Sequence, residues 1–82
     1  MQNIQIQAYN HLNQNNQVVK YLELFGSINQ REAFNLEIIT QGKFSNINRL
    51  SARIVDIKKQ KLLGNKRIDK VNFGRFAVYK LI

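Results

Sequence analysis

Hydrophobic residues recur at intervals of three and four residues through the middle of the chain. Ile47, Leu50, Ile54 and Ile57 follow the spacing 3, 4, 3, which places their side chains in one stripe along an α-helix. The residues between them are mostly polar, small or basic. We therefore predict an amphipathic helix within residues 46–61, with one buried face and one exposed face.

Two further helices are predicted before this one. Apolar residues of the segment 16–25 fall on one helical face, and Gly26 follows at a position where helices often end in the left-handed conformation. A second helix is predicted to start at Asn29 and to end near Ile39. Glu32, three residues after Asn29, could reach back to its backbone N–H, as in a capping box.

After Gly64 the hydrophobic period changes from helical spacing to two. Residues 66–71 and 75–81 are predicted to be strands, with residues 72–74 as a three-residue hairpin loop. A shorter alternation in residues 4–8 favours an N-terminal edge strand, and a frayed polar tail is the alternative for the same segment.

The order of predicted elements is three helices followed by a β-hairpin, preceded by a short strand if the N-terminal segment is ordered. This is an α+β architecture of the winged helix-turn-helix type, in which the second and third helices form the helix-turn-helix and the hairpin forms the wing. We expect residues 16–82 to form this domain. Residues 1–15 are expected to be an N-terminal extension or edge strand.

Basic charge is confined to the second half of the 82-residue chain. Residues 42–82 carry eleven Lys or Arg residues against two acids, a net charge of +9, whereas residues 1–41 carry two basic residues against three acids, a net charge of −1. A domain with such an asymmetry usually faces a polyanion. Nucleic acid is therefore the first partner to consider.

Composition argues against several other classes. The chain has no Cys and one His, which leaves no disulfide framework, thiol nucleophile or Cys-ligated zinc. No clustered acids, Ser–His–Asp spacing or Gly-rich phosphate loop points to an enzyme, so we expect neither catalysis nor a cofactor. The apolar stretches are too short for a membrane span and the N-terminus has no signal-peptide pattern, so a cytoplasmic protein is expected.

Two segments carry a resemblance to a known family. The sequences GSINQREA (residues 26–33) and NRLSARIVDIKK (residues 48–59) resemble the small winged helix-turn-helix DNA-binding proteins of phages and mobile elements. The Tyr-Lys-Leu at residues 79–81 matches the end of the last strand in that group. The resemblance covers residues 17–82 and implies that residues 48–59 enter the DNA major groove. The segment 38–47 is longer than the usual turn.

The candidate DNA-binding residues lie on the third predicted helix, in the connection before it and on the hairpin. Arginine can grip phosphate or read guanine through two hydrogen bonds, whereas lysines near the helix end and on the wing would contact the backbone without reading sequence. A small residue in the middle of the outward face permits close approach to bases. The candidates are Lys43, Ser45, Asn48, Arg49, Ala52, Arg53, Lys58, Lys59, Lys66, Arg67, Lys70 and Arg75.

Several of these residues have a structural alternative. Arg53 could instead pair with Asp56 or Asp69, and Asn48 could cap the helix rather than contact adenine. Cations in the last helical turn are also favoured by the helix dipole. Most of the aromatic residues are expected in the core. Phe73 at the predicted hairpin tip is the exception, since it could wedge into a groove or contact a protein.

We expect a sequence-specific double-stranded DNA-binding protein that regulates transcription for a phage or mobile element. Three alternatives stay open: an excisionase-like factor that bends DNA, a phage-type inhibitor that contacts a host nucleic-acid-binding complex, and an RNA-binding protein. Pairing of the N-terminal strand across a two-fold axis would make a homodimer. The expected partners are therefore duplex DNA, with a second copy or a host protein as further candidates.

Overall fold

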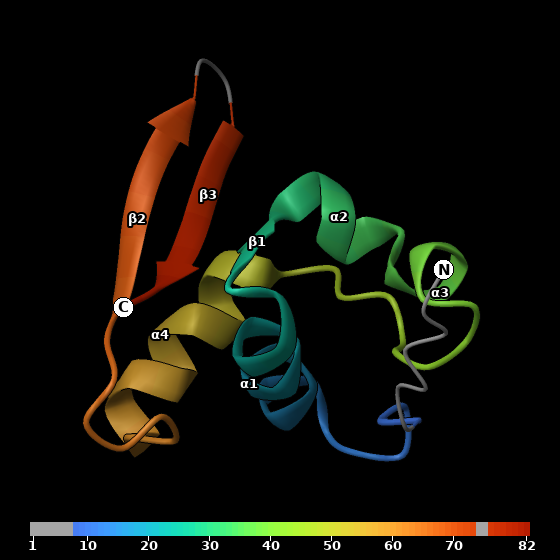
Figure 1. Cartoon of the computed structure of the whole chain (residues 1–82), viewed down its shortest axis with the longest axis horizontal. Coiled ribbons are helices and arrows are strands. Elements are labelled where there is room, and N and C mark those ends of the chain that lie inside the picture. Colours follow the sequence, from blue (N-terminus) through green and yellow to red (C-terminus); the bar gives the residue numbers. More distant parts are fainter. Residues whose placement is uncertain (1–7, 74–75) are drawn as a thin grey trace, which may run out of the picture.

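The computed structural model describes residues 8–73 and 76–82. Within these ranges the chain forms four α-helices and one three-stranded antiparallel sheet (Figure 1), which confirms the α+β class. The elements in chain order are α1 (Gln14–Phe25), β1 (Ser27–Asn29), α2 (Gln30–Phe34), α3 (Leu36–Ile39), α4 (Leu50–Gln60), β2 (Ile68–Phe73) and β3 (Phe76–Leu81).

The sheet contains a strand that the sequence did not predict. Its order is β1-β3-β2, so that the last strand of the chain is central. β1 has three residues, and its middle residue Ile28 pairs with Tyr79 of β3. Both side chains are buried. A three-residue strand is too short to show alternation in the sequence, and β1 exists because β3 offers it a backbone partner.

The core lies where α1 crosses α4 under the sheet (Figure 1). α1 contributes Val18 and Leu22, which are fully buried, and α4 contributes its stripe Leu50, Ile54 and Ile57. The predicted stripe of the third helix is therefore confirmed. Burial of these aliphatic side chains is the main source of stability for so small a domain.

α1 begins slightly earlier than predicted and ends where predicted. Its N-cap is Asn13, whose side chain accepts a hydrogen bond from the backbone N–H of Asn16. At its end Gly26 has φ 84° and donates to the carbonyl of Leu22. Phe25 does not join the core as expected, because 48 % of it is exposed. The Phe25 ring packs against the ring of Tyr21 instead, with 4.6 Å between the two ring centroids.

The second predicted helix is broken into two short helices. Asn29 is the N-cap as predicted and accepts from the backbone N–H of Glu32 at 2.8 Å. The Glu32 carboxylate accepts a hydrogen bond from the side-chain amide of Asn29 at 2.9 Å, and not from its backbone N–H as in a capping box. The break falls at Asn35, between α2 and α3. The side chain of Asn46, in the connection between α3 and α4, accepts a hydrogen bond from the N–H of Glu37 and so caps α3.

Phe44 anchors the connection between α3 and α4 by placing its side chain in the core. This side chain is fully buried and is the largest such side chain in the part of the chain that the structure describes. Its ring lies 5.4 Å from the ring of Tyr9 and 5.5 Å from that of Tyr21, centroid to centroid. The next residue, Ser45, donates its N–H to the buried side chain of Gln17. The long connection is therefore an ordered part of the fold.

α4 starts later than predicted. Asn48 does not cap it: the N-cap position is Arg49, which makes no capping hydrogen bond through its side chain. The side chain of Gln30 takes over this role and accepts from the N–H of Leu50 at 3.0 Å, while its amide donates to the carbonyl of Ile47 at 3.2 Å. A tertiary contact thus fixes the start of the helix.

The hairpin is longer than predicted. Asn72 pairs with Ala77 and Phe73 with Phe76, so a loop at residues 72–74 is wrong because two of its residues continue the ladder. Gly74 and Arg75 lie outside the described residues, as do the predicted strand residues Ile4 and Ile6. Ala8 belongs to no strand. Along β3, Tyr79 is buried in the core, and Ala77 and Leu81 pack against it.

Candidate nucleic-acid interface

α4 presents a continuous outward face opposite its buried stripe. The face consists of Ser51, Val55, Lys58 and Lys59, which are exposed, and Ala52, which is half buried. It is less basic than the sequence suggested, since the two lysines lie toward the C-terminal end and Val55 occupies the middle. Val55 was missed as a candidate. A methyl-bearing residue there could contact thymine methyl groups in a major groove.

Asn48 and Arg49 lie just before α4, and both are exposed. The helix predicted at residues 48–59 is therefore α4, Leu50–Gln60. Asn48 and Arg49 belong to the connection that precedes it. Since the backbone there is not helical, Arg49 extends from the N-terminal end of the helix. Neither side chain forms an ion pair or a side-chain hydrogen bond among the described residues.

Arg53 is engaged within the molecule. Its guanidinium lies 3.3 Å from the Asp56 carboxylate, one helical turn away, and 30 % of its side chain is exposed. Its Nε atom is buried and has no hydrogen-bond partner in the described structure. The intramolecular alternative for Arg53 is therefore realised, with Asp56 and not Asp69 as the partner. Only its exposed part is available to a ligand.

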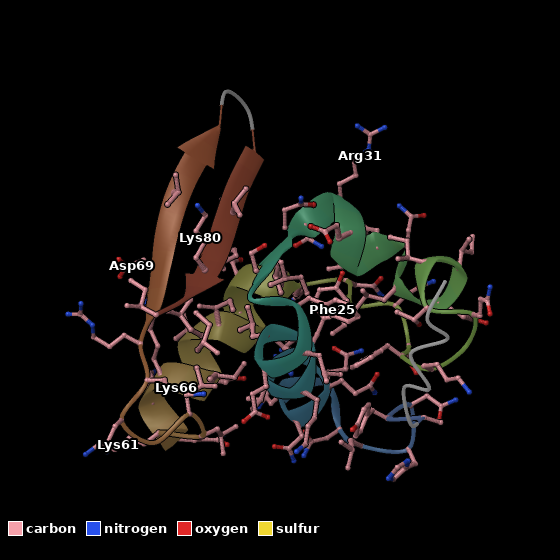
Figure 2. All side chains as sticks on the ribbon, in the orientation of Figure 1. Phe25, Arg31, Lys61, Lys66, Asp69 and Lys80 are labelled. Carbon is pink, nitrogen blue, oxygen red and sulfur yellow. The ribbon has the colours of Figure 1, made fainter. Side chains whose placement is uncertain are left out.

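Basic side chains also gather where α4 ends and the hairpin begins. Lys66, Arg67 and Lys70 are exposed, and Lys61 follows the last residue of α4. Figure 2 shows Lys61 and Lys66 at the same end of the molecule, with Asp69 further along β2. Lys61 is one of the lysines expected at the end of this helix, and it lies at the C-cap position of α4. Arg75 lies outside the described residues.

Lys43 and Ser45 are set apart from this basic surface. The carbonyl of Lys43 accepts from the N–H of Tyr9 at 2.7 Å, and the N–H of Ser45 is used by Gln17. The segment that follows α3 lies on the side of the molecule away from the hairpin (Figure 1). The structure therefore does not group these two residues with the hairpin cations.

A second surface is apolar. Phe34, Ile38 and Ile39 on α2 and α3 are exposed, with Ile38 at 77 % and Phe34 at 49 %. Phe34 was expected in the core. It is exposed because the break at Asn35 separates its helix from the one that follows, so one apolar stripe cannot serve both.

The acids of the first half are mostly engaged. Glu32 accepts from the buried hydroxyl of Tyr21 at 2.8 Å, and Glu23 pairs with Lys20 at 3.7 Å. Burial, together with the hydrogen bond and negative charge of Glu32, raises the pKa of Tyr21 above its ordinary value. The Tyr21–Glu32 hydrogen bond joins α1 to α2, whereas the Lys20–Glu23 pair lies within α1.

Among residues 8–73 and 76–82 no three His, Cys, Asp or Glu side chains are grouped as a metal ion would require. No helix in the same ranges is both long enough and apolar enough to cross a membrane. Comparison of the chain with known protein families, with curated proteins and with solved structures found no match.

Proposed function

We propose that this protein is a sequence-specific, double-stranded DNA-binding regulator of the winged helix-turn-helix type found in phages and mobile elements. In this proposal α2 to α4 form the helix-turn-helix, and β2 with β3 forms the wing. α4 enters the major groove by its outward face. Arg49 reaches the groove or the adjoining backbone from the start of the helix.

The observation that carries the proposal is the pairing of two surfaces around α4. The helix buries its aliphatic stripe and exposes an outward face with Val55 in its middle and two lysines toward its C-terminal end. The cations at the start of the hairpin adjoin the end of the same helix. An exposed α-helix of this kind fits a B-DNA major groove, which is about 12 Å wide. Neighbouring lysines and arginines supply the backbone contacts that dominate affinity.

The test is selection of bound duplexes from a random library, followed by affinity measurements on the selected and a scrambled duplex over a salt series. The proposal expects a preferred site and an affinity ratio of about 10³ or more at physiological salt. Equal, salt-sensitive binding to both duplexes would contradict it. A circular-permutation assay on the selected site would then separate an excisionase-like bending factor from a simple regulator.

The apolar surface of Phe34, Ile38 and Ile39 favours a second candidate function, contact with a protein. Such exposed apolar side chains on a small domain often mark an interaction site. A phage-type inhibitor of a host nucleic-acid-binding complex would use this surface. The variant Ile38→Glu separates the two candidates, because it should leave DNA binding unchanged and abolish binding to a protein partner. Competition with duplex RNA tests the remaining alternative, RNA binding.

A further inference from the structure

A cavity of about 280 Å³ lies between the end of α4 and the start of β2. Four of its lining residues are cationic, Lys58, Lys61, Lys66 and Arg67, and one is acidic, Asp69. The remaining lining residues are apolar or glycine, namely Ile57, Leu63, Gly64 and Ile68. A cavity of this size has room for several water molecules, and so for a hydrated phosphate group held by the charged side chains. The sequence did not predict this cavity, because its walls come from two elements, the end of α4 and the start of β2, that meet only in the folded protein.

None of the cations around the cavity forms an ion pair in the described structure. The ion pairs among the described residues are Lys20–Glu23 and Arg53–Asp56, and neither involves a residue that lines the cavity. Like charges that share one opening repel each other, and at physiological salt the screening length is about 8 Å, so the repulsion is only partly screened. An anion in the cavity would replace this repulsion by attraction. The single carboxylate of Asp69 offsets only one of the four charges.

The helix dipole explains only part of this cluster. The C-terminal end of a helix favours cations, which accounts for Lys58 in the last turn of α4. It does not account for Lys66 and Arg67, which approach from the strand side. Arg67 is held in place by exchanging two backbone hydrogen bonds with Ile82, at 2.8 and 3.3 Å. The strand side of the cluster is therefore positioned by the sheet.

The backbone of Lys61 adds an independent observation. This residue ends α4 in the left-handed conformation, with φ 53° and ψ 42°, where glycine is strongly preferred. A lysine there carries a conformational cost that a glycine would avoid. The Lys61 side chain can therefore be removed by a change to glycine without straining the backbone at the cavity.

We propose that this cavity binds a phosphate group of the DNA backbone. The inference rests on the proposed DNA-binding function and deepens it, because it places a specific phosphate contact at the base of the hairpin. Lys58 belongs both to the outward face of α4 and to the cavity wall, so the two sites adjoin. DNA that occupies the face therefore continues past the C-terminal end of α4 and delivers a phosphate to Lys61, Lys66 and Arg67.

The variant Lys61→Gly tests this site without weakening the fold. Glycine suits φ 53°, so thermal unfolding followed by circular dichroism should give a Tm at or above that of the unmodified protein. Gln41→Gly is the matched control, because Gln41 also has φ 53° but carries no charge and does not line the cavity. Lys80→Gln controls for net charge, since it removes one cation elsewhere.

Two measurements are made on each protein. The first is the salt dependence of binding to the selected duplex. Loss of one phosphate contact should reduce the slope of log K against log salt by about 0.9 in Lys61→Gly, with no change in Gln41→Gly and a smaller change in Lys80→Gln. The second is an NMR titration with inorganic pyrophosphate, which should shift the backbone amides of residues 58–67 in the unmodified protein and not in Lys61→Gly.

The outcomes separate this site from the proposed function. Duplex binding with the same salt slope in all variants, and no pyrophosphate shift, would overturn the phosphate site and leave DNA binding intact. Pyrophosphate shifts without any duplex binding would overturn both the DNA-backbone assignment and the proposed function, and would leave a site for free phosphate compounds. Displacement of pyrophosphate by the duplex supports the backbone phosphate as the ligand, whereas simultaneous binding of both overturns it.

Discussion

Individual side-chain amides hold the irregular segments of this protein in place. Gln17, only 2 % exposed, donates to the carbonyl of Leu12 and accepts from the N–H of Ser45. Gln30 in the same way satisfies one carbonyl and one N–H near the start of α4. An amide can do this because it carries both a donor and an acceptor. These residues replace the backbone partners that loops lack.

The variant Gln30→Ala should lower the free energy of unfolding by about 1–2 kcal/mol. Removing the amide leaves the N–H of Leu50 at the helix start and the carbonyl of Ile47 without their partner, which is comparable to the loss of an N-cap. Urea denaturation measures the change. Gln60→Ala is the control, since Gln60 is exposed in the last turn of the same helix. Equal stability of both variants would show that Gln30 does not cap α4.

Tyr21 should make stability fall at high pH. In an unfolded chain the phenol has a pKa of about 10, and in the folded protein burial and Glu32 raise the pKa of Tyr21 above that value. Above about pH 10 the unfolded chain loses this proton while the folded chain keeps it. The stabilisation is therefore complete below pH 10 and declines above it.

The variant Tyr21→Phe isolates this effect. At pH 7 it should be less stable by about 1–3 kcal/mol, because the hydrogen bond to an ionised carboxylate is lost. The difference between the two proteins should narrow at pH 11. Urea denaturation of both proteins at the two pH values measures it, and pH effects common to both proteins cancel in the comparison. A difference that stays constant between pH 7 and pH 11 would contradict the assignment.

At the scale of elements, short pieces are stabilised by neighbours distant in the sequence. β1 has three residues and α3 has four, and pieces of this length are not stable alone. β1 is held by β3, and α3 is capped by Asn46. The connection that follows α3 is anchored by Phe44 between two tyrosine rings. The arrangement of α2, α3 and α4 depends on these contacts more than on helix propensity.

Truncation of phenylalanine to alanine should lower the free energy of unfolding more at Phe44 than at Phe34. Phe44→Ala should lower the free energy of unfolding by about 3–5 kcal/mol, the usual cost of removing a buried aromatic side chain. Phe34→Ala removes the same atoms from a side chain that is 49 % exposed, and should cost less than half as much. Chemical denaturation of both variants compares them. Similar losses would mean that Phe44 does not anchor the connection.

At the scale of the whole molecule, charge is arranged around α4. Residues 42–82 carry a net charge of +9, and Lys58, Lys59, Lys61, Lys66 and Arg67 of this segment lie on α4 or between α4 and β2. Asp56, the acid within α4, is paired with Arg53. Long-range attraction to a polyanion is therefore expected to be strong, and in the proposed function few residues would read bases.

Arg49 and Lys59 should affect DNA binding in different ways. Arg49→Ala should cost about 1–3 kcal/mol of binding to the selected duplex and relax the preference at one base pair, whereas Lys59→Ala should weaken binding to all duplexes alike. Affinities for the selected site and its single-base variants distinguish the two patterns. Arg53→Ala should resemble neither, because its guanidinium is held by Asp56. Unchanged affinity in a double variant at Arg49 and Arg53 would contradict the placement of α4 in the groove.

Local patterns were sufficient for the main elements of the fold. The helices at Gln14–Phe25 and Leu50–Gln60, both hairpin strands and the Asn29 cap were predicted within a few residues. Such features depend on residues that are neighbours in the chain, so periodicity and capping preferences report them. Within the candidate site, the exposure of Lys59 follows from the same periodicity, whereas Arg49 lies before the helix.

The sequence by itself therefore determined the α+β class, the buried stripe of α4 and the concentration of positive charge in the second half. Only the tertiary structure decided the pairing of β1 with β3, the break at Asn35, the start of α4 under Gln30, the pairing of Arg53 with Asp56 and the cavity between α4 and β2. The first group follows from spacing along the chain. The second depends on backbone and side-chain partners that come together only when distant segments pack, and no local pattern encodes which partner is chosen.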